Sequence, residues 1–170
     1  MFTTALVTGG NGNLGRLVAQ QLEDAGTKVI SFDLPGSEGA YSDLRHAVVT
    51  GDIRDQELLK KTVTTHKPDV VIHLASVLSG SSEVNPSLAW EVNASSSIRF
   101  MRMCLEHQTG PFFFPSTGAT YGPDLSSPVG LDTPQWPENI YGATKVAVER
   151  IGVYLKLKPV SYTHLTLPTT

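Results

Sequence analysis

The sequence is poor in the features that mark several classes of protein. Its 170 residues include one cysteine, Cys104, so no intrachain disulfide can form, which fits a reducing cytoplasm. No apolar run reaches the roughly 18 residues of a membrane span, and the N-terminus has no basic segment ahead of an apolar one, so we expect neither an anchor nor a signal peptide. The net charge of −3 disfavours binding to nucleic acid or an anionic membrane. The histidines show no metal-ligand spacing, and His73, within an apolar segment, is expected in the core.

Short apolar segments alternate with segments of helical periodicity along the chain. Near-continuous apolar runs are typical of strands buried on both faces of a parallel sheet. The strands are expected at residues 5–8, 28–33, 47–50, 69–75 and 111–116. Helices are expected from Leu14 to Ala25 with Gly26 as the stop, from the capping residue Asp55 to a point before Pro68, from Ser87 to about Glu106, and from about Tyr141 to about Lys156. This order predicts right-handed crossovers and a doubly wound parallel sheet of the α/β class.

The segment TALVTGGNGNLG leaves an apolar strand for a loop that is almost free of side chains. Gly9, Gly12 and Gly15 form the pattern G-x-x-G-x-x-G, which permits a tight turn, close approach of a pyrophosphate, and close packing of the following helix. The first residues of that helix, Asn13 and Leu14, belong to an N-terminus whose free N–H groups suit phosphate oxygens. Three glycines alone are equally compatible with a plain surface turn.

The ends of the next strands favour the dinucleotide interpretation. Asp33 ends the second strand, where an acid can accept hydrogen bonds from both hydroxyls of an adenosine ribose and repel a 2′-phosphate. We therefore expect NAD rather than NADP as the cofactor. Two further segments are expected to contact it, namely Asp52 and Ile53 of GDIRD beside the adenine and Leu74, Ala75 and Ser76 of HLAS across the sheet edge.

The segment YGATK places Tyr141 and Lys145 four residues apart, on one face of a helix. A lysine ammonium beside a phenol favours the phenolate, which can exchange a proton with a substrate hydroxyl at neutral pH. This spacing also occurs by chance in many helices. Here Thr117 ends the fifth strand at the same sheet edge as the glycine loop, and a hydroxyl, a phenol and an ammonium beside a nicotinamide suit hydride transfer at a carbinol.

In combination, these motifs resemble the extended short-chain dehydrogenase/reductase superfamily, in its NAD-dependent epimerase/dehydratase group, over residues 2 to about 156. The resemblance implies an NAD-dependent enzyme in which Thr117, Tyr141 and Lys145 are the catalytic residues. It also implies that Asn93 of WEVNASSS helps to order the catalytic site and that Ser116 lies on the cofactor side.

The resemblance also bears on the substrate. The segments ASVLSG, NPSLAWEVN and FFPSTGATYGP look most like the short-chain type of L-threonine 3-dehydrogenase, and they resemble sugar-acid dehydrogenases such as those acting on erythronate. Ser79, Ser81 and Thr117 would then lie near a small-molecule substrate, whose secondary hydroxyl is oxidised. UDP-sugar 4-epimerases share the cofactor motifs but match these segments less well, and they are the alternative. A truncated NAD-binding module with little or no activity is a further alternative.

The C-terminal end departs from the family pattern. Residues 1–158 are expected to form an NAD-binding Rossmann domain with the Tyr/Lys helix, lacking the C-terminal substrate lobe that the resemblance implies. Residues 159–170 do not resemble the family and are expected to be a foreign tail, in which the alternation over 160–167 predicts an edge strand. The resemblance implies a homodimer built by the helices at 87–106 and 141–156, or a larger homo-oligomer if the tail is exchanged.

Overall fold

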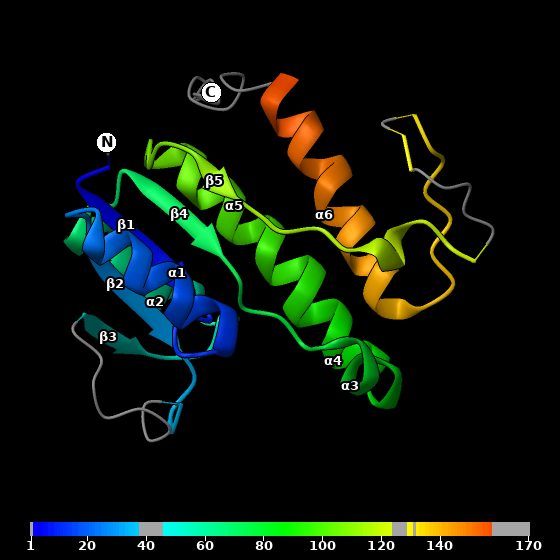
Figure 1. Cartoon of the computed structure of the whole chain (residues 1–170), viewed down its shortest axis with the longest axis horizontal. Coiled ribbons are helices and arrows are strands. Elements are labelled where there is room, and N and C mark those ends of the chain that lie inside the picture. Colours follow the sequence, from blue (N-terminus) through cyan, green and yellow to red (C-terminus); the bar gives the residue numbers. More distant parts are fainter. Residues whose placement is uncertain (1, 38–45, 124–128, 131, 158–170) are drawn as a thin grey trace, which may run out of the picture.

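In the computed structural model, which describes residues 2–37, 46–123, 129–130 and 132–157, helices cover both faces of a parallel sheet (Figure 1). Within those residues the sheet has five strands: β1 (Thr4–Thr8), β2 (Lys28–Asp33), β3 (Ala47–Thr50), β4 (Val70–His73) and β5 (Phe112–Phe113). Their order in the sheet is β3-β2-β1-β4-β5, and every neighbouring pair is parallel. The predicted doubly wound α/β sheet is confirmed. Winding reverses between β1 and β4, which is where ligands bind in such sheets.

The helical elements of the described residues are α1 (Asn13–Asp24), α2 (Gln56–His66), α3 (Ser79–Val84), α4 (Pro86–Ala89), the π-helix η2 (Trp90–Ser96), α5 (Ser97–Glu106), the 3₁₀-helix η3 (Gly118–Thr120) and α6 (Ile140–Leu157). Local signals set several of these boundaries. Gly26 follows α1 with a φ of +84°, a conformation that glycine adopts at low cost. The Asp55 carboxylate caps α2 by accepting a hydrogen bond from the Leu58 N–H at 2.9 Å.

The segment between β4 and β5 is more divided than the sequence predicts. The single helix expected from Ser87 to Glu106 is a run of α4, η2 and α5, and α3 was not predicted. Asn85 separates α3 from α4, because its side chain accepts a hydrogen bond from the Leu88 N–H and Pro86 then opens α4. The wider turns of η2 place Asn93 in the middle of this run.

Strand β5 is shorter than expected, since only Phe112 and Phe113 pair with β4. Pro111 and Pro115 lie on either side of this pair and have no N–H to donate to a ladder. Strand β4 is also shorter than predicted, and the chain beyond its end becomes one wall of the site described below.

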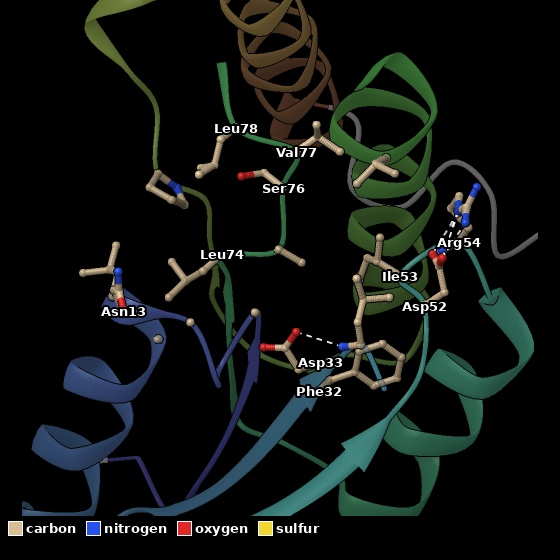
Figure 2. A pocket seen from close by; sticks show the side chains of 18 of the residues that line it. Asn13, Phe32, Asp33, Asp52, Ile53, Arg54, Leu74, Ser76, Val77 and Leu78 are labelled. Carbon is tan, nitrogen blue, oxygen red and sulfur yellow. Dashed lines mark hydrogen bonds and ion pairs between the residues drawn. The ribbon is translucent and has the colours of Figure 1, made fainter. Parts of the chain in front are cut away.

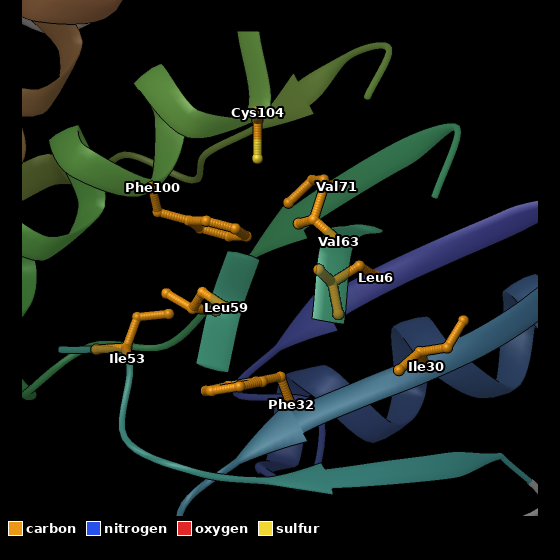
Figure 3. Packing of buried hydrophobic residues seen from close by; sticks show 9 residues of the cluster. All are labelled: Leu6, Ile30, Phe32, Ile53, Leu59, Val63, Val71, Phe100 and Cys104. Carbon is orange, nitrogen blue, oxygen red and sulfur yellow. The ribbon is translucent and has the colours of Figure 1, made fainter. Parts of the chain in front are cut away.

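Alternate residues of the strands face opposite helical layers. Figure 3 shows one layer, in which Leu6 of β1 and Ile30 of β2 pack with side chains from α2 and α5, among them Leu59 and Phe100. On the opposite face, Val7 and Val29 pack against Ala19 of α1. Helix α6 packs on α5, where Met101 and Val148 meet. This packing fixes the carboxyl ends of β1, β2 and β4 at one edge of the sheet.

Two further expectations concern the C-terminal tail and membrane-spanning segments. The predicted tail, residues 159–170, with its predicted strand at 160–167, lies outside the described residues. Within the part of the chain that the structure describes, no helix is both long enough and apolar enough to span a membrane.

Candidate functional site

A cavity of about 790 Å³ opens at the carboxyl ends of the central strands. Its walls come from the glycine loop, from the loops that follow β2, β3 and β4, and from α6, and Figure 2 shows the β2 and β4 sides facing one another. All the residues predicted to contact the cofactor line this cavity: Gly9, Gly12, Asn13, Leu14, Gly15, Asp33, Asp52, Ile53, Leu74, Ala75, Ser76, Ser116, Tyr141 and Lys145. Segments distant in the sequence therefore share one concave surface of the size that small-molecule sites have.

The glycine loop is packed too closely for side chains at two of its predicted positions. Gly9 has a φ of +68°, and a Cβ on it would lie 2.8 Å from the Ala75 nitrogen. A Cβ on Gly15 would lie 2.2 Å from the Gly9 oxygen, so the start of α1 rests on the turn itself. No side chain caps α1, whose first residues line the cavity. Its N-terminal N–H groups and the positive end of its dipole are therefore suited to an anion.

Asp33 is held at the cavity wall by main-chain donors. Its Oδ2 accepts a hydrogen bond from the Asn11 N–H at 2.9 Å, and its Oδ1 accepts one from the Leu34 N–H at 2.8 Å. A carboxylate has about four acceptor sites on its two oxygens, so acceptor capacity remains for a ligand. Asp33 thus presents an oriented, partly exposed negative charge at the end of β2.

Asp52 also lines the cavity, but its carboxylate is engaged by Arg54. The guanidinium donates from Nε to both oxygens and from Nη2 to Oδ2 at 2.6 Å. These hydrogen bonds lower the pKa of Asp52. Arg54 itself lines the cavity, although the sequence analysis did not single it out. Ile53, between them, is 5% exposed and belongs to the core as well as to the wall.

Lys145 is buried beside Tyr141 at the α6 side of the cavity. Its Nζ donates to the Pro115 carbonyl at 3.2 Å and lies 4.4 Å from the Phe114 ring centroid and 5.5 Å from that of Tyr141. Lys145 is 3% exposed. Burial lowers the pKa of its ammonium to about 8, and the nearby Glu149 carboxylate opposes that shift. An ammonium, a phenol and an open cavity therefore meet at one place, as the YGATK spacing predicts.

The segment after β5 is joined to α6 by hydrogen bonds to the Glu149 carboxylate. Glu149 accepts hydrogen bonds from the Ser116 hydroxyl and from the Gln135 amide, the latter at 2.8 Å. Arg150, the next residue of α6, donates to the other end of Gln135. These bonds hold Ser116 against the helix that carries Tyr141 and Lys145.

Asn93 does not line the cavity but supports its wall. Its Oδ1 accepts a hydrogen bond from the Val77 N–H at 2.7 Å, and its Nδ2 donates to the Val77 carbonyl at 2.9 Å. The side chain is 1% exposed and both of its polar ends are used. Val77, with Ser76 and Leu78, forms the wall that follows β4. The residue expected to order the site thus contacts the main chain of this wall.

Three residues expected near the substrate are not among the cavity-lining residues. Thr117 caps η3, with its Oγ1 accepting a hydrogen bond from the Ala119 N–H at 3.3 Å. Ser79 and Ser81 are exposed on α3, a helix that was not predicted, and they are absent from the lining set. The cavity instead includes apolar residues that the sequence did not single out, namely Val77, Leu78, Leu88 and Val92.

The expectation for His73 is confirmed, since it lies in the core with both ring nitrogens bonded. Its Nδ1 is 2.6 Å from the Thr8 hydroxyl and its Nε2 is 2.8 Å from the Ser97 hydroxyl. Burial, and secondarily the Lys145 charge, lower the pKa of His73 to about 3, so the ring is neutral. Among the residues with described positions, no group of three or more His, Cys, Asp or Glu side chains could hold a metal ion.

The strand order, the glycine loop and the acid at the end of β2 define a nucleotide-binding protein of the Rossmann type. The sequence profile of the NAD dependent epimerase/dehydratase family matches residues 5–169, and the chain belongs to this family.

Curated relatives and a solved structure agree with this assignment. The chain is 39% identical over 149 residues to a UDP-glucose 4-epimerase of Halalkalibacterium halodurans, covering 86% of this chain and 44% of the relative. It is 33% identical over 156 residues to a D-erythronate dehydrogenase of Cupriavidus necator, covering 85% and 48%. It matches the crystal structure of the Thermus thermophilus UDP-glucose 4-epimerase in complex with NAD with a TM-score of 0.83 and 27% identity, covering 91% and 51%. The chain therefore spans about half the length of these relatives.

Proposed function

We propose that this chain is the NAD-binding half, with the catalytic helix, of an enzyme that acts at a secondary hydroxyl of a small substrate. The observation that carries the proposal is the single cavity that joins Asp33 and the glycine loop to Tyr141 and Lys145. Residues 1–158 would form this half, and the remaining length of the relatives would supply a substrate lobe. When bound, NAD supplies the hydride acceptor and donor of the reaction.

The residues at the β2 side of the cavity fit the adenosine and pyrophosphate of NAD. Asp33 would accept hydrogen bonds from the adenosine ribose, using the acceptor sites that Asn11 and Leu34 leave open. The uncapped start of α1 and the space above Gly12, where a Cβ would meet only the Gly9 oxygen at 3.3 Å, suit the pyrophosphate. Asp52 and Ile53 would lie beside the adenine, with Leu74, Ala75 and Ser76 forming the opposite wall.

At the α6 side, Tyr141 would act as the general base that accepts the proton of the substrate hydroxyl. Lys145 would hold the nicotinamide ribose, because its Nζ has three donors and the Pro115 carbonyl uses one. Its Nζ lies 5.5 Å from the Tyr141 ring centroid, so both groups would face the same end of the cofactor. Ser116 would contact the cofactor, and Thr117, the next residue, would bind the substrate oxygen by a hydrogen bond from its hydroxyl. Asn93 would keep the Val77 wall in place.

The first candidate reaction is 4-epimerisation of a UDP-sugar. The support is that the Halalkalibacterium halodurans relative and the Thermus thermophilus structure are both UDP-glucose 4-epimerases. Oxidation of L-threonine, which the sequence segments suggested, stays a prediction. The second candidate is oxidation of a sugar acid, for which the support is the D-erythronate dehydrogenase of Cupriavidus necator.

Two assays on the purified chain test the proposal. Calorimetric titration with NAD should show binding at one site per chain. Absence of binding would overturn the proposal that this chain binds NAD. Incubation with UDP-galactose should yield UDP-glucose without accumulation of NADH, whereas incubation with D-erythronate should yield NADH if the second candidate is correct. Binding of NAD with neither conversion would leave this chain as an NAD-binding module and would place turnover in the longer protein.

A further inference from the structure

A buried side chain outside the cavity joins the glycine loop to the end of β2. Asn11 is 4% exposed and does not line the cavity, although Gly9 and Gly12 of the same loop do. The Ser31 hydroxyl donates to Asn11 Oδ1 at 2.8 Å, and Asn11 Nδ2 donates to the Ser37 hydroxyl oxygen at 2.9 Å. The Ser37 hydroxyl in turn donates to the Leu34 carbonyl at 2.7 Å. The amide of Asn11 therefore links the loop to β2 and to the turn that follows it.

The same residue contacts the acid of the site through its main chain. The Asn11 N–H donates to Asp33 Oδ2 at 2.9 Å, while the Leu34 N–H donates to Asp33 Oδ1 at 2.8 Å. One donor to the Asp33 carboxylate therefore comes from the glycine loop and the other from the turn after β2. The Asn11 side chain joins this loop to this turn through Ser37.

We propose that Asn11 is a positioning residue that sets the orientation of Asp33 and thereby the preference of the cavity for an adenosine ribose with a free 2′-hydroxyl. The inference rests on the proposed NAD site and concerns how its selectivity is built. Asn11 contacts neither ribose nor phosphate in this account. It acts by keeping its own N–H, and the Leu34 N–H, on the two oxygens of Asp33.

The glycine loop packs closely on β2 beside the Asn11 side chain, so loss of this side chain should change the position of the loop. A Cβ on Gly10 would lie 2.3 Å from the Ser31 Oγ, so the loop rests directly on β2 at the point where Ser31 meets Asn11. Without the amide, the loop loses both of its side-chain bonds to the β2 segment, and a buried Ser31 hydroxyl loses its acceptor. The Asp33 carboxylate then gains freedom to rotate. A rotating carboxylate both attracts a 2′-hydroxyl less and repels a 2′-phosphate less.

Calorimetric titrations with NAD, NADP and an NAD analogue that lacks the adenosine 2′-hydroxyl test this role. For Asn11→Ala we expect the affinity for NAD to fall about tenfold, with the affinity for NADP unchanged or higher, because a hydrogen bond to a charged group is weakened. The loss on removing the 2′-hydroxyl should be smaller in the variant than in the wild type. Ser37→Ala, at a half-buried position, should shift the NAD/NADP ratio in the same direction by about threefold.

Two controls separate positioning from general support. Thr27→Ala removes another buried hydroxyl, which donates to the Phe2 carbonyl at 3.0 Å away from the cavity, and should lower stability without changing the NAD/NADP ratio. In an Asp33→Ala background, Asn11→Ala should no longer change the affinity for NAD, since the group through which it acts is gone. Equal losses for NAD and NADP, or an undiminished effect without Asp33, would overturn the inference. A wild-type chain that binds no NAD would instead overturn the proposed function and this inference together.

Discussion

The two ends of the cavity are built in different ways. At the β2 end, formed by the glycine loop and Asp33, the bonds to the key carboxylate come from main-chain N–H groups of adjacent turns. At the α6 end, formed by Tyr141, Lys145 and the segment after β5, the contacts join side chains to groups far along the chain, as in Lys145 with the Pro115 carbonyl. The first end is therefore oriented by main-chain donors, one of which comes from the glycine loop, 22 residues away in the sequence. The second depends on a few long-range side-chain contacts around a buried charge.

Replacing the Tyr141 phenol tests whether the α6 end carries the chemistry. Binding of NAD at the β2 end should be largely unaffected. Tyr141→Phe should lower turnover of any substrate by about 10²- to 10⁴-fold, because it removes the general base. The affinity for NAD, measured by calorimetry, should stay within a few-fold. Tyr121→Phe is the matched control, since Tyr121 lies at the end of η3 and does not line the cavity. Unchanged turnover in Tyr141→Phe would assign the chemistry to another residue.

Burial of the Lys145 ammonium should lower the free energy of unfolding of the chain at neutral pH. Lowering of the Lys145 pKa from an ordinary 10.5 to about 8 corresponds to roughly 3 kcal/mol. Between those values the folded chain binds fewer protons than the unfolded chain, so wild-type stability should rise as the pH rises. Lys145→Met should therefore be more stable than the wild type at pH values below about 8, with the gap closing towards pH 10.5.

Urea unfolding across this pH range measures the effect of Lys145. Lys60→Met, on the exposed side of α2, is the control and should change the free energy of unfolding by less than about 0.5 kcal/mol at each pH. A wild type and a Lys145→Met variant with parallel pH profiles would show that the ammonium is not destabilised by burial.

Removal of the acid should affect the β2 end alone. Asp33→Ala should lower the affinity for NAD about tenfold or more, because a carboxylate accepting hydrogen bonds from ribose hydroxyls is lost. The gap between NAD and NADP should narrow, since the repulsion of a 2′-phosphate is lost with it. Asp24→Ala makes the same change in charge at the exposed end of α1 and should leave both affinities as they are. Selectivity that persists in Asp33→Ala would place its origin elsewhere.

The smallest effect concerns a cap that belongs to the fold and not to the cavity. Asp55→Ala removes the acceptor for the Leu58 N–H at the start of α2 and should lower the free energy of unfolding by about 1 kcal/mol. The NAD affinity should not change, because Asp55 is not among the lining residues. A loss of NAD affinity as large as that in Asp33→Ala would show that NAD binding at the β2 end depends on the α2 cap as well as on the glycine loop and Asp33.

The contrast between the two ends also explains what the sequence could predict. Strands β2 and β3 and the Asp55 cap lie where expected, and so do the glycines, because each follows from a short segment and its local preferences. The role of Asn11 is harder to see in the sequence, because its side-chain partners Ser31 and Ser37 are 20 and 26 residues away. No local signal distinguishes Asn11 from an ordinary loop residue. Arg54, by contrast, pairs with Asp52 only two residues earlier.

At the α6 end the sequence locates the reactive pair but not its surroundings. Tyr141 and Lys145 follow from their spacing on one helix. The π-helix η2, and with it the bond from Asn93 to Val77, depends on tertiary packing between segments that the sequence pattern treats as separate. The helix α3 that carries Ser79 and Ser81 was likewise not predicted, and the proximity of these residues to a substrate stays a prediction.

A crystal structure of the chain grown with NAD tests most directly whether the two ends form one cofactor site. The account predicts electron density for the adenosine ribose on the Asp33 carboxylate, for the pyrophosphate at the start of α1, and for the nicotinamide ribose beside Tyr141 and Lys145. Density for the cofactor at the β2 end alone, with the nicotinamide directed away from α6, would contradict it.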